Sequence, residues 1–423
     1  MIIRGGRVVD PVTQTDRKAD VLINDGLIED VFPLIDDKRN KDGEVVDAAG
    51  MVVAPGLVDV HAHFRDPGQT EKEDIGTGER AAIAGGYTTV VLMANTEPAV
   101  DRQSILNSII KRVSDSQIHV HQLATVTNGR MGKSLTDMAK LAEDGAPGFS
   151  DDGLPIINDV LMRKAMETAA KLGTPISLHE EDPSYIFEQG INAGEVARKF
   201  GLTGADRKAE IVMVERDLKL ALETGAIINI QHVSAAESVA MIREAKKKDK
   251  AGLIHAEATP HHFSLTEKAI IDRGSEAKVN PPLRTERDRL AIIDGLKDGT
   301  IDMIATDHAP HMEMEKRRSF VTAPSGMIGL ETALALAVTN LVKAGHMDLM
   351  KMIELMSTNP AKLYGFRAGS LEVGAVGDVV VFDPNEKWTV NRFYSKSFNS
   401  PFIGEELYGK VHYTISEGKR ILL

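Results

Sequence analysis

The stretch Gly56-Leu57-Val58-Asp59-Val60-His61-Ala62-His63 decides the fold, because its apolar run is typical of a buried strand. Two histidines end this strand, and the period of two places both imidazoles on the same side. They can therefore reach a single metal ion. The pair alone is a moderate signal, since exposed strands also carry histidines by chance. At the end of a buried strand, however, two histidines without partners need a purpose.

Seven further candidate strands follow, and helical segments separate most of them. The segments Ala165–Leu172 and Arg207–Glu223 have apolar residues at the helical period, with Gly173 and Gly225 as breakers just after them. This alternation predicts an α/β fold, a (β/α)8 TIM-like barrel with functional residues at the C-terminal strand ends. A doubly wound open sheet is the alternative, but no glycine-rich dinucleotide fingerprint follows any strand. The candidate strands are Leu57–His63, Tyr87–Asn95, Ile118–Thr125, Ala146–Ser150, Pro175–His179, Ala226–His232, Leu253–Ala258 and Ile301–Thr306.

Both ends of the chain differ from this middle part, because they consist of short β-rich runs separated by turn residues. The runs predict strands at Met1–Val9, Ala19–Ile28, Glu44–Val53, Asp378–Phe382, Val411–Ile415 and Arg420–Leu423, with a turn at Asp383-Pro384-Asn385. We expect the two ends to meet in one small β-sandwich domain, although two independent decorations would look similar. The predicted division is 1–53 and 369–423 for the sandwich and 54–368 for the barrel.

Composition narrows the class of protein. The 423 residues include 50 basic and 62 acidic ones, a formal net charge of −12 without a dense basic patch. Binding to nucleic acid or to an anionic membrane is therefore not expected. Residues 1–20 do not resemble a signal peptide, and no run approaches the roughly 20 apolar residues that span a bilayer. We predict a cytoplasmic protein. With no cysteine, any metal site must use histidine and carboxylate ligands.

Polar side chains accumulate where the other candidate strands end. They are Asp151 and Asp152 after the fourth strand, His179 after the fifth, His232 after the sixth, and Asp307, His308 and His311 at the eighth. Taken singly, each has a duller explanation, such as an ordinary Asp-Asp-Gly turn or a histidine satisfied in the core. Unrelated structural roles would not place these residues at the same end of the barrel repeatedly. The whole group is therefore stronger evidence for a functional site than any one of its residues.

This set of nitrogen and oxygen ligands suits zinc, or less specifically manganese, iron or cobalt. There are enough ligands for two ions bridged by one carboxylate, an arrangement that activates water and polarises a carbonyl group. The aspartate at the end of the eighth strand can then act as general base and acid. The sequence thus predicts a metal-dependent hydrolase.

At the level of motifs, the sequence resembles the dihydroorotase family, in its longer bacterial (type I) class within the amidohydrolase superfamily. The resemblance covers nearly the whole chain. Its markers are Asp59–Gly68, Gly86-Tyr87-Thr88-Thr89, Asn95-Thr96-Glu97-Pro98, Phe149–Gly153, Lys278–Arg284 and Ala305–His311. It implies the reversible cyclisation of N-carbamoyl-L-aspartate to L-dihydroorotate in pyrimidine biosynthesis, with a metal-bridging hydroxide attacking the ring amide in the hydrolytic direction.

The resemblance also implies roles for single residues. It assigns His61, His63 and Asp307 to a first zinc ion, His179 and His232 to a second, and Asp152 to the bridge between them, with Asp307 as general acid and base. It assigns Arg65, Asn95 and His311 to the substrate carboxylate, and Asn280, Ser325 and Gly326 to the ring amide. No lysine lies between Lys140 and Lys164, which supports an aspartate bridge rather than a carboxylated lysine. Departures from the family pattern are Ala94, Glu180 and Ser325.

Other expectations concern partners and alternatives. The resemblance implies a homodimer and association with aspartate transcarbamoylase. A hydantoinase or allantoinase would share the fold and metals but lack the aspartate bridge and the Arg65 contact, and a non-catalytic subunit would be expected to lose ligands. The charged segment Met312–Pro324, after the eighth strand, is a hypothetical mobile lid.

Overall fold

A closed barrel of parallel strands forms the centre of the protein. The computed structural model describes residues 1–41 and 43–423. Two sheets build the barrel, one of β6 (Leu57–Ala62), β7 (Tyr87–Leu92) and β8 (His119–Gln122), the other of β9 (Ile176–Leu178), β10 (Ile228–Ile230), β11 (Ile254–Ala258) and β12 (Met303–Ile304). Phe149 joins the sheets through bridges to Ala124 and Ile176, and a bridge from Ala62 to His308 closes the ring. The predicted barrel is therefore confirmed, although its fourth strand consists only of the bridges at Phe149.

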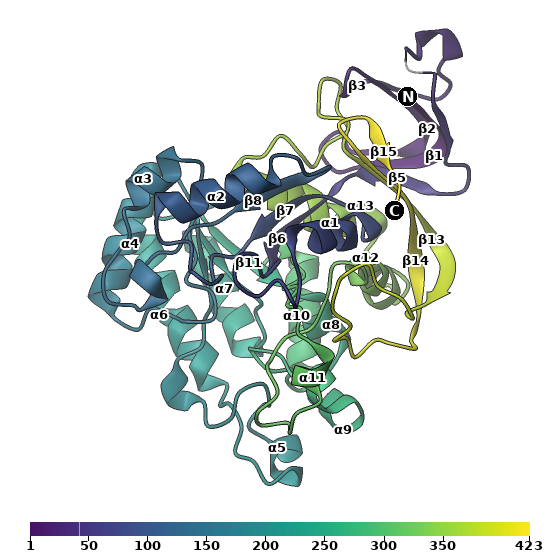
Figure 1. The fold of residues 1–423 in the computed structure, drawn as a ribbon. Coiled ribbons are helices and arrows are strands. Elements are labelled where there is room, and N and C mark those ends of the chain that lie inside the picture. Colours follow the sequence, from purple (N-terminus) through teal and green to yellow (C-terminus); the bar gives the residue numbers. More distant parts are fainter. Residues whose placement is uncertain (42) are drawn as a thin grey trace.

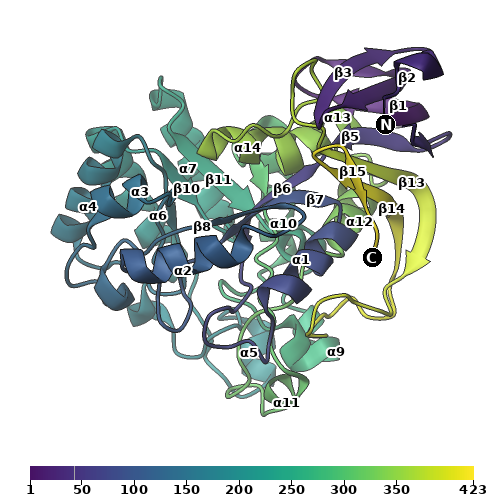
Figure 2. The same cartoon turned by 45° about the horizontal axis from the view of Figure 1, so that its top comes forward.

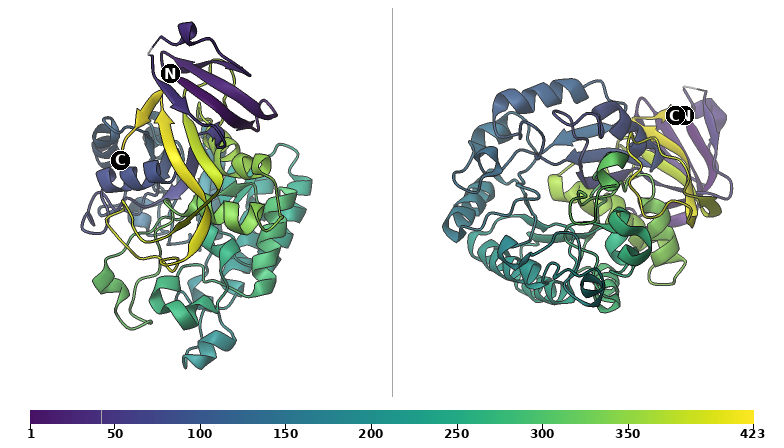
Figure 3. Two further views of the ribbon diagram at one scale, coloured as in Figure 1. Left: turned by 90° about the vertical axis from the view of Figure 1, so that its right-hand side faces the viewer. Right: turned by 60° about the horizontal axis from the view of Figure 1, so that its bottom comes forward.

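Helices surround the strands, as the right-hand view of Figure 3 shows. The longer ones are α1 (Ile75–Ala84), α2 (Gln103–Val113), α4 (Asp159–Leu172), α6 (Lys208–Thr224), α7 (Ala236–Lys248) and α10 (Glu286–Asp298). The shorter ones are α3 (Met138–Glu143), α5 (Glu195–Lys199), α8 (Pro260–Ser264), α9 (Ala269–Arg273), α11 (Glu313–Lys316), α12 (Ala333–Ala337), α13 (Leu349–Ile353) and α14 (Asn359–Tyr364). As predicted, α4 and α6 stop at Gly173 and Gly225, whose left-handed backbone ends each helix.

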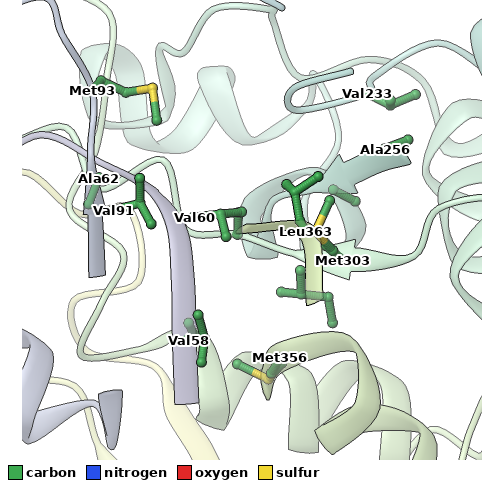
Figure 4. Close-up of a cluster of buried hydrophobic side chains, with 14 of the residues drawn as sticks. Val58, Val60, Ala62, Val91, Met93, Val233, Ala256, Met303, Met356 and Leu363 are labelled. Atoms are coloured by element: carbon green, nitrogen blue, oxygen red, sulfur yellow. The ribbon is translucent and has the colours of Figure 1, made fainter. Parts of the chain in front are cut away.

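The apolar core lies between the strands and these helices. Along β6 the side chains alternate, so that Val58 and Val60 face the helices. Figure 4 shows them in a buried cluster with Met356 and Leu363, which come from the π-helical turn Glu354–Thr358 and from α14. The residues in between, Asp59 and His61, face the inside of the barrel, and Asp59 accepts a hydrogen bond from the backbone N–H of Thr306 (3.0 Å). The alternation of β6 therefore sets its histidines inside the barrel.

Strands from both ends of the chain form one eight-stranded sheet beside the barrel (Figure 1). Its order is β15-β14-β13-β5-β1-β2-β3, with β4 paired to β1. The members are β1 (Ile2–Asp10), β2 (Thr15–Asn24), β3 (Leu27–Phe32), β4 (Val45–Asp47), β5 (Val52–Pro55), β13 (Val379–Thr389), β14 (Glu406–Ser416) and β15 (Lys419–Ile421). Antiparallel pairing of β5 with β13 joins the two ends. The ends thus meet in one β-domain, while its division at 53/54 and 368/369 stays a prediction.

Three details of this β-domain differ from the sequence-based expectation. The predicted strand Glu44–Val53 is two strands, β4 and β5, because the chain turns between them, where the N–H of Met51 donates to the carbonyl of Ala48. The predicted strand Ala19–Ile28 is two strands, because the chain turns at Asp25 and Gly26 and β3 folds back on β2. The predicted turn at Asp383-Pro384-Asn385 lies inside β13, where the pairing with β14 shifts between Asp383 and Lys387. Pairing with a neighbouring strand overrides the local turn signal there. In the described part of the chain, no helix is long and apolar enough to cross a membrane.

Candidate active site

His61 and His63 lie inside the barrel at the end of β6, and a neighbouring side chain orients each ring. Nδ1 of His61 lies 2.6 Å from Oε1 of Glu257, and Nδ1 of His63 lies 2.9 Å from Oδ1 of Asn95. Each Nδ1–H therefore donates outward, which leaves the lone pair of Nε2 free to bind a cation. Both Nε2 atoms lie close to Asp307 Oδ1, that of His63 at 3.1 Å and that of His61 at 3.4 Å.

His179 and His232 approach the same point from β9 and β10. Nδ1 of His179 lies 2.9 Å from Nε2 of His232, while its other nitrogen lies 3.1 Å from Oε2 of Glu181. Glu257 also reaches this half of the site, because the backbone N–H of His232 donates to its Oε1 (3.4 Å). A single buried carboxylate thus holds one histidine from each half.

Asp152 lies at the centre of the four imidazoles. Its Oδ1 is 3.6 Å from His61 Nε2, 3.5 Å from His179 Nδ1 and 3.9 Å from His232 Nε2, and its Oδ2 is 3.6 Å from His63 Nε2. The other member of the aspartate pair, Asp151, turns away and accepts hydrogen bonds from the backbone of Val126 and Thr127. A purely structural role in an ordinary turn therefore suits Asp151 but not Asp152.

The charges of this cluster support a cation site. Burial alone would raise the pKa of Asp152 and Asp307, but the surrounding imidazoles outweigh it and hold both values well below the usual range. Both aspartates are therefore anionic at neutral pH.

The donor atoms fit divalent metal ions. Nε2 of His61 is buried without a hydrogen-bond partner in the described part of the chain and points into the cluster. Two sets have ligand atoms within 4.8 Å of one another, namely His61, His63 and Asp307, and His61, Asp152 and His232. The first set matches the predicted ligands of one ion. The donors are imidazole nitrogen and carboxylate oxygen, which zinc and similar transition metals accept.

A cavity of about 550 Å³ opens above the cluster. Of the residues predicted for the site, it is lined by His63, Arg65, Asn95, Asp152, His179, His232, Asn280, Asp307, His311, Ser325 and Gly326. His61 is the exception, since it is fully buried below the cavity floor. The structure therefore brings all the sequence-predicted positions together, and their individual roles stay predictions.

Arg65 projects from the strand exit of β6 into the cavity wall. Its Nε–H donates to the carbonyl of Pro310 (3.3 Å), and its Nη2 lies 3.5 Å from His311 Nε2. Its backbone has φ 56, a left-handed conformation unusual for a residue with a side chain. The side chain of Asn95 is already hydrogen-bonded within the site, because its Nδ2 donates to Asp152 Oδ2 (2.9 Å) and its Oδ1 accepts from His63. The same Nδ2 also lies 3.5 Å from the backbone carbonyl of Asp152.

The cavity wall also carries polar atoms that lack hydrogen-bond partners in the described part of the chain. Oδ1 of Asn280, Oγ of Ser325 and Nδ1 of His311 are buried without hydrogen bonds in the described part of the chain. Buried polar atoms are normally satisfied, so such atoms on a cavity wall indicate a ligand-binding surface. At Gly326, φ is +129 and a Cβ would lie 2.9 Å from that of Ala309, so no larger residue fits there.

Several residues of the site were not predicted from the sequence. Glu257 and Glu181 orient the histidines, and the only signal for Glu257 is an acid inside a buried strand. Arg130 also lines the cavity and has a left-handed backbone with φ 56. It follows Asn128 and Gly129 in a loop at the same end of the barrel.

The predicted lid segment is fastened to the barrel by two buried lysines. Nζ of Lys278 donates to the carbonyls of Phe320 (2.8 Å), Val321 (3.1 Å) and Ala323 (2.7 Å). Nζ of Lys316 donates to the carbonyls of Pro324 (3.1 Å) and Gly326 (2.9 Å). These contacts fix the carbonyls that precede the cavity wall, and the mobility of the segment stays a hypothesis.

Solved structures share the fold. An L-hydantoinase (dihydropyrimidinase) from Arthrobacter aurescens superposes with a TM-score of 0.88 at 24% identity, covering 99% of this chain and 95% of that one. A dihydropyrimidinase from Brevibacillus agri NCHU1002 gives a TM-score of 0.85 at 23% identity, covering 100% and 94%. At this level of identity the likeness shows the architecture alone, a TIM-like barrel with a β-sandwich.

Curated relatives are much more similar in sequence. A dihydroorotase of Clostridioides difficile strain 630 is 52% identical over 99% of both chains, and one of Clostridium acetobutylicum is 52% identical over 99% of this chain and 98% of its own. A dihydroorotase of Streptococcus thermophilus is 48% identical over 99% of both. The model of the amidohydrolase family matches residues 52–421. With these matches and a histidine–aspartate cluster at the barrel mouth, the chain belongs to the amidohydrolase family.

Proposed function

We propose that this protein is a dihydroorotase, which reversibly cyclises N-carbamoyl-L-aspartate to L-dihydroorotate with loss of water in pyrimidine biosynthesis. The observation that carries the proposal is that Arg65 shares one cavity with the buried histidine–aspartate cluster. The cluster suits hydrolysis of an amide, and the guanidinium suits a substrate that bears a carboxylate. Relatives named dihydroorotase, 52% identical over nearly the full length, support the same reading.

The cluster would hold two zinc ions. His61, His63 and Asp307 would bind one, His179 and His232 the other, and Asp152 would bridge them, since it lies within 4 Å of all four histidines. When bound, such ions lower the pKa of a coordinated water and polarise the carbonyl of the scissile amide. Glu257, Glu181 and Asn95 would keep the imidazoles in the required orientation through their other ring nitrogens.

Arg65 and His311 would hold the substrate carboxylate. A planar guanidinium binds a carboxylate through two parallel hydrogen bonds, and the net charge of −12 makes such a local cation necessary for an anionic substrate. The cavity-wall atoms of Asn280 and Ser325 that lack hydrogen-bond partners would bind the ring amide. Held at both ends, the ring would lie with its amide carbonyl over the cluster, and this positioning contributes much of the rate.

Asp307 would transfer the proton. In ring opening, the oxygen of water adds to the ring carbonyl carbon, the carbon–nitrogen bond breaks, and the released nitrogen gains a proton. The carboxylate of Asp307 lines the cavity beside His61 and His63, where it would accept the proton of the attacking water and return it to nitrogen. Cyclisation runs through the same steps in reverse.

A hydantoinase or allantoinase is the second candidate, because a solved structure with the same fold is an L-hydantoinase. That comparison stays at 24% identity and concerns the fold only. Asp152 stands in the bridging position, where the alternative uses a carboxylated lysine, and Arg65 has no partner in a substrate without a carboxylate. A non-catalytic subunit is disfavoured, since all six expected ligands are present.

The decisive experiment measures ring opening by the purified, zinc-loaded protein. L-Dihydroorotate is compared with dihydrouracil, the same ring without the carboxylate, and with hydantoin and allantoin. We expect turnover of dihydroorotate, little of the other three, and loss of turnover in an Asp307→Ala variant. Preference for hydantoin or allantoin would favour the second candidate, and inactivity on all four with metal bound would favour the non-catalytic one.

The remaining parts of this proposal concern the metal, the oligomeric state, a partner protein and the cellular location. Zinc as the metal, two ions per chain, a homodimer, association with aspartate transcarbamoylase and a cytoplasmic location stay predictions. Metal analysis per chain and light scattering of the purified protein address the first three directly.

A further inference from the structure

A segment of the β-domain crosses to the barrel mouth and contacts the loops of the cavity. Between β13 and β14 the chain leaves the sheet, and residues 390–405, which we call the strap, run back toward the barrel (Figure 2). In the strap, Ser395, Ser397 and Asn399 are buried while Lys396 and Phe398 between them are exposed. Because burial alternates from one residue to the next, the small polar side chains point inward, and their partners must be polar groups of the barrel.

The first half of the strap is attached to the loop before α1. Ser395 donates a hydrogen bond to Glu73, and the backbone N–H of Lys396 donates to Glu73 Oε1 (3.1 Å). The hydroxyl of Ser397 donates to the carbonyl of Lys72 (2.7 Å). These contacts lie outside the cavity and explain how the strap is held.

Asn399 has a different set of partners, in two loops of the cavity wall. Its Nδ2 donates to the carbonyls of Ala309 (3.0 Å) and Gly326 (3.1 Å), and its Oδ1 accepts from the backbone N–H of His311 (3.0 Å). Its own carbonyl accepts from the N–H of Ile328 (2.9 Å). The amide thus uses both N–H groups and its oxygen, and only this orientation satisfies two carbonyls and one N–H.

These two loops carry residues that face the cavity from one side. The two loops are also joined directly, because the backbone N–H of Ala309 donates to the carbonyl of Met327 (2.9 Å) and Nε2 of His311 lies 2.9 Å from the carbonyl of Ser325. Gly326 packs so closely on Ala309 that the spacing of the loops leaves no room for a side chain. To these direct contacts Asn399 adds a side chain from outside both loops, which bonds to Ala309 and His311 in one loop and to Gly326 in the other.

We propose that Asn399 is a positioning residue for substrate binding, which sets the spacing of the loops that bear His311 and Gly326. This inference rests on the proposed function, because those two residues are the predicted contacts of the carboxylate and the ring. Asn399 reaches the substrate only through these loops. None of its hydrogen bonds involves the six predicted metal ligands.

An Asn399→Asp variant tests the inference with almost no change in volume. The carboxylate oxygen that replaces Nδ2 faces the carbonyls of Ala309 and Gly326, so two hydrogen bonds are lost and become repulsive. We expect KM for dihydroorotate to rise about tenfold or more, with a smaller change in kcat, since substrate binding is what the loops govern. The dissociation constant of orotate, a carboxylate-bearing ring that is not hydrolysed, should rise in parallel, with the zinc content unchanged.

The matched control is Asn391→Asp, the same substitution at an exposed position of the strap. It should leave KM, kcat and the orotate dissociation constant as in the wild type. Asn399→Ser, which keeps one donor and one acceptor, should give an intermediate KM and serves as the test variant if Asn399→Asp does not fold. Equal KM values in the wild type and Asn399→Ser would overturn the inference. Loss of zinc from an Asn399 variant, or a fall in its kcat with KM unchanged, would overturn it as well. Inactivity of the wild type on dihydroorotate would instead refute the proposed function.

Discussion

Glu257 allows a test of the metal centre that does not depend on turnover. Its Oε1 lies 2.6 Å from His61 Nδ1, and its Oε2 accepts from Asn229 Nδ2 (2.7 Å), in a fully buried position. In a Glu257→Gln variant, one side-chain atom becomes an NH2 group. Whichever way that amide is turned, it places a donor against either His61 or Asn229, so one buried hydrogen bond is always lost.

The expected cost follows from the kind of hydrogen bond. A bond to a charged partner contributes about 1.5–3 kcal/mol, and each 1.4 kcal/mol corresponds to about a factor of ten. We therefore expect the zinc dissociation constant of Glu257→Gln to rise about 10- to 100-fold, in line with other groups that orient metal ligands. Titration against a competing chelator measures it.

Asp302 supplies the matched control. Its Oδ2 lies 2.7 Å from Nδ1 of His255, at the other end of β11, so it forms a similar histidine–carboxylate pair away from the cluster. Asp302→Asn should lower the stability without changing the zinc affinity. An unchanged dissociation constant in Glu257→Gln, or an equal rise in Asp302→Asn, would refute the reasoning.

Three further predictions concern the cavity and its loops. Arg65→Gln should lower kcat/KM for dihydroorotate at least about 100-fold and Arg65→Lys about tenfold, because lysine keeps the charge but not the paired hydrogen bonds; equal losses in steady-state kinetics would contradict this. Gly326→Ala should lower the free energy of unfolding by about 1–3 kcal/mol in urea titrations and raise KM, whereas Gly345→Ala, where a Cβ meets nothing within 4 Å, should leave KM unchanged. Burial lowers the pKa of Lys316 to about 8, below its unfolded value, so the unfolded chain binds more protons above pH 8. The free energy of unfolding of the wild type, measured against Lys316→Met, should therefore rise between about pH 8 and pH 10.5, and a flat difference would contradict the shift.

Local sequence patterns were sufficient for the barrel and for the end of it at which the polar residues gather, but not for the strand bounds: β7 ends at Leu92 rather than at Asn95, and β8 at Gln122 rather than at Thr125. The apolar run before His61 and the period of two predicted both the strand and the side on which its histidines lie. The β-domain was less accessible, because strand pairing across distant segments decided it. The Asp-Pro-Asn signal at Asp383 indicates a turn, yet pairing of β13 with β14 absorbs those residues into an irregular strand.

The unpredicted parts of the site share one cause. Glu257 and Asn399 act through partners that lie 196 and 88 positions away in the sequence, at His61 and His311. No periodicity or motif at either residue reports such a contact, since a buried acid or amide in an apolar context has many structural explanations. Metal ligands at strand ends can be predicted from their position in the sequence, whereas the groups that orient them can be identified only from the three-dimensional structure.

The pairing of β5 with β13 has a consequence for the order in which parts of the protein can fold during synthesis. β5 is synthesised early, but the strand that covers its edge begins only at Val379, and the strap with Asn399 follows later still. During translation, all six expected metal ligands and the cavity-lining loops emerge before the strap that ties those loops together. Because domains fold as units, we expect the loops to reach their final spacing only after the last strands of the chain have been made.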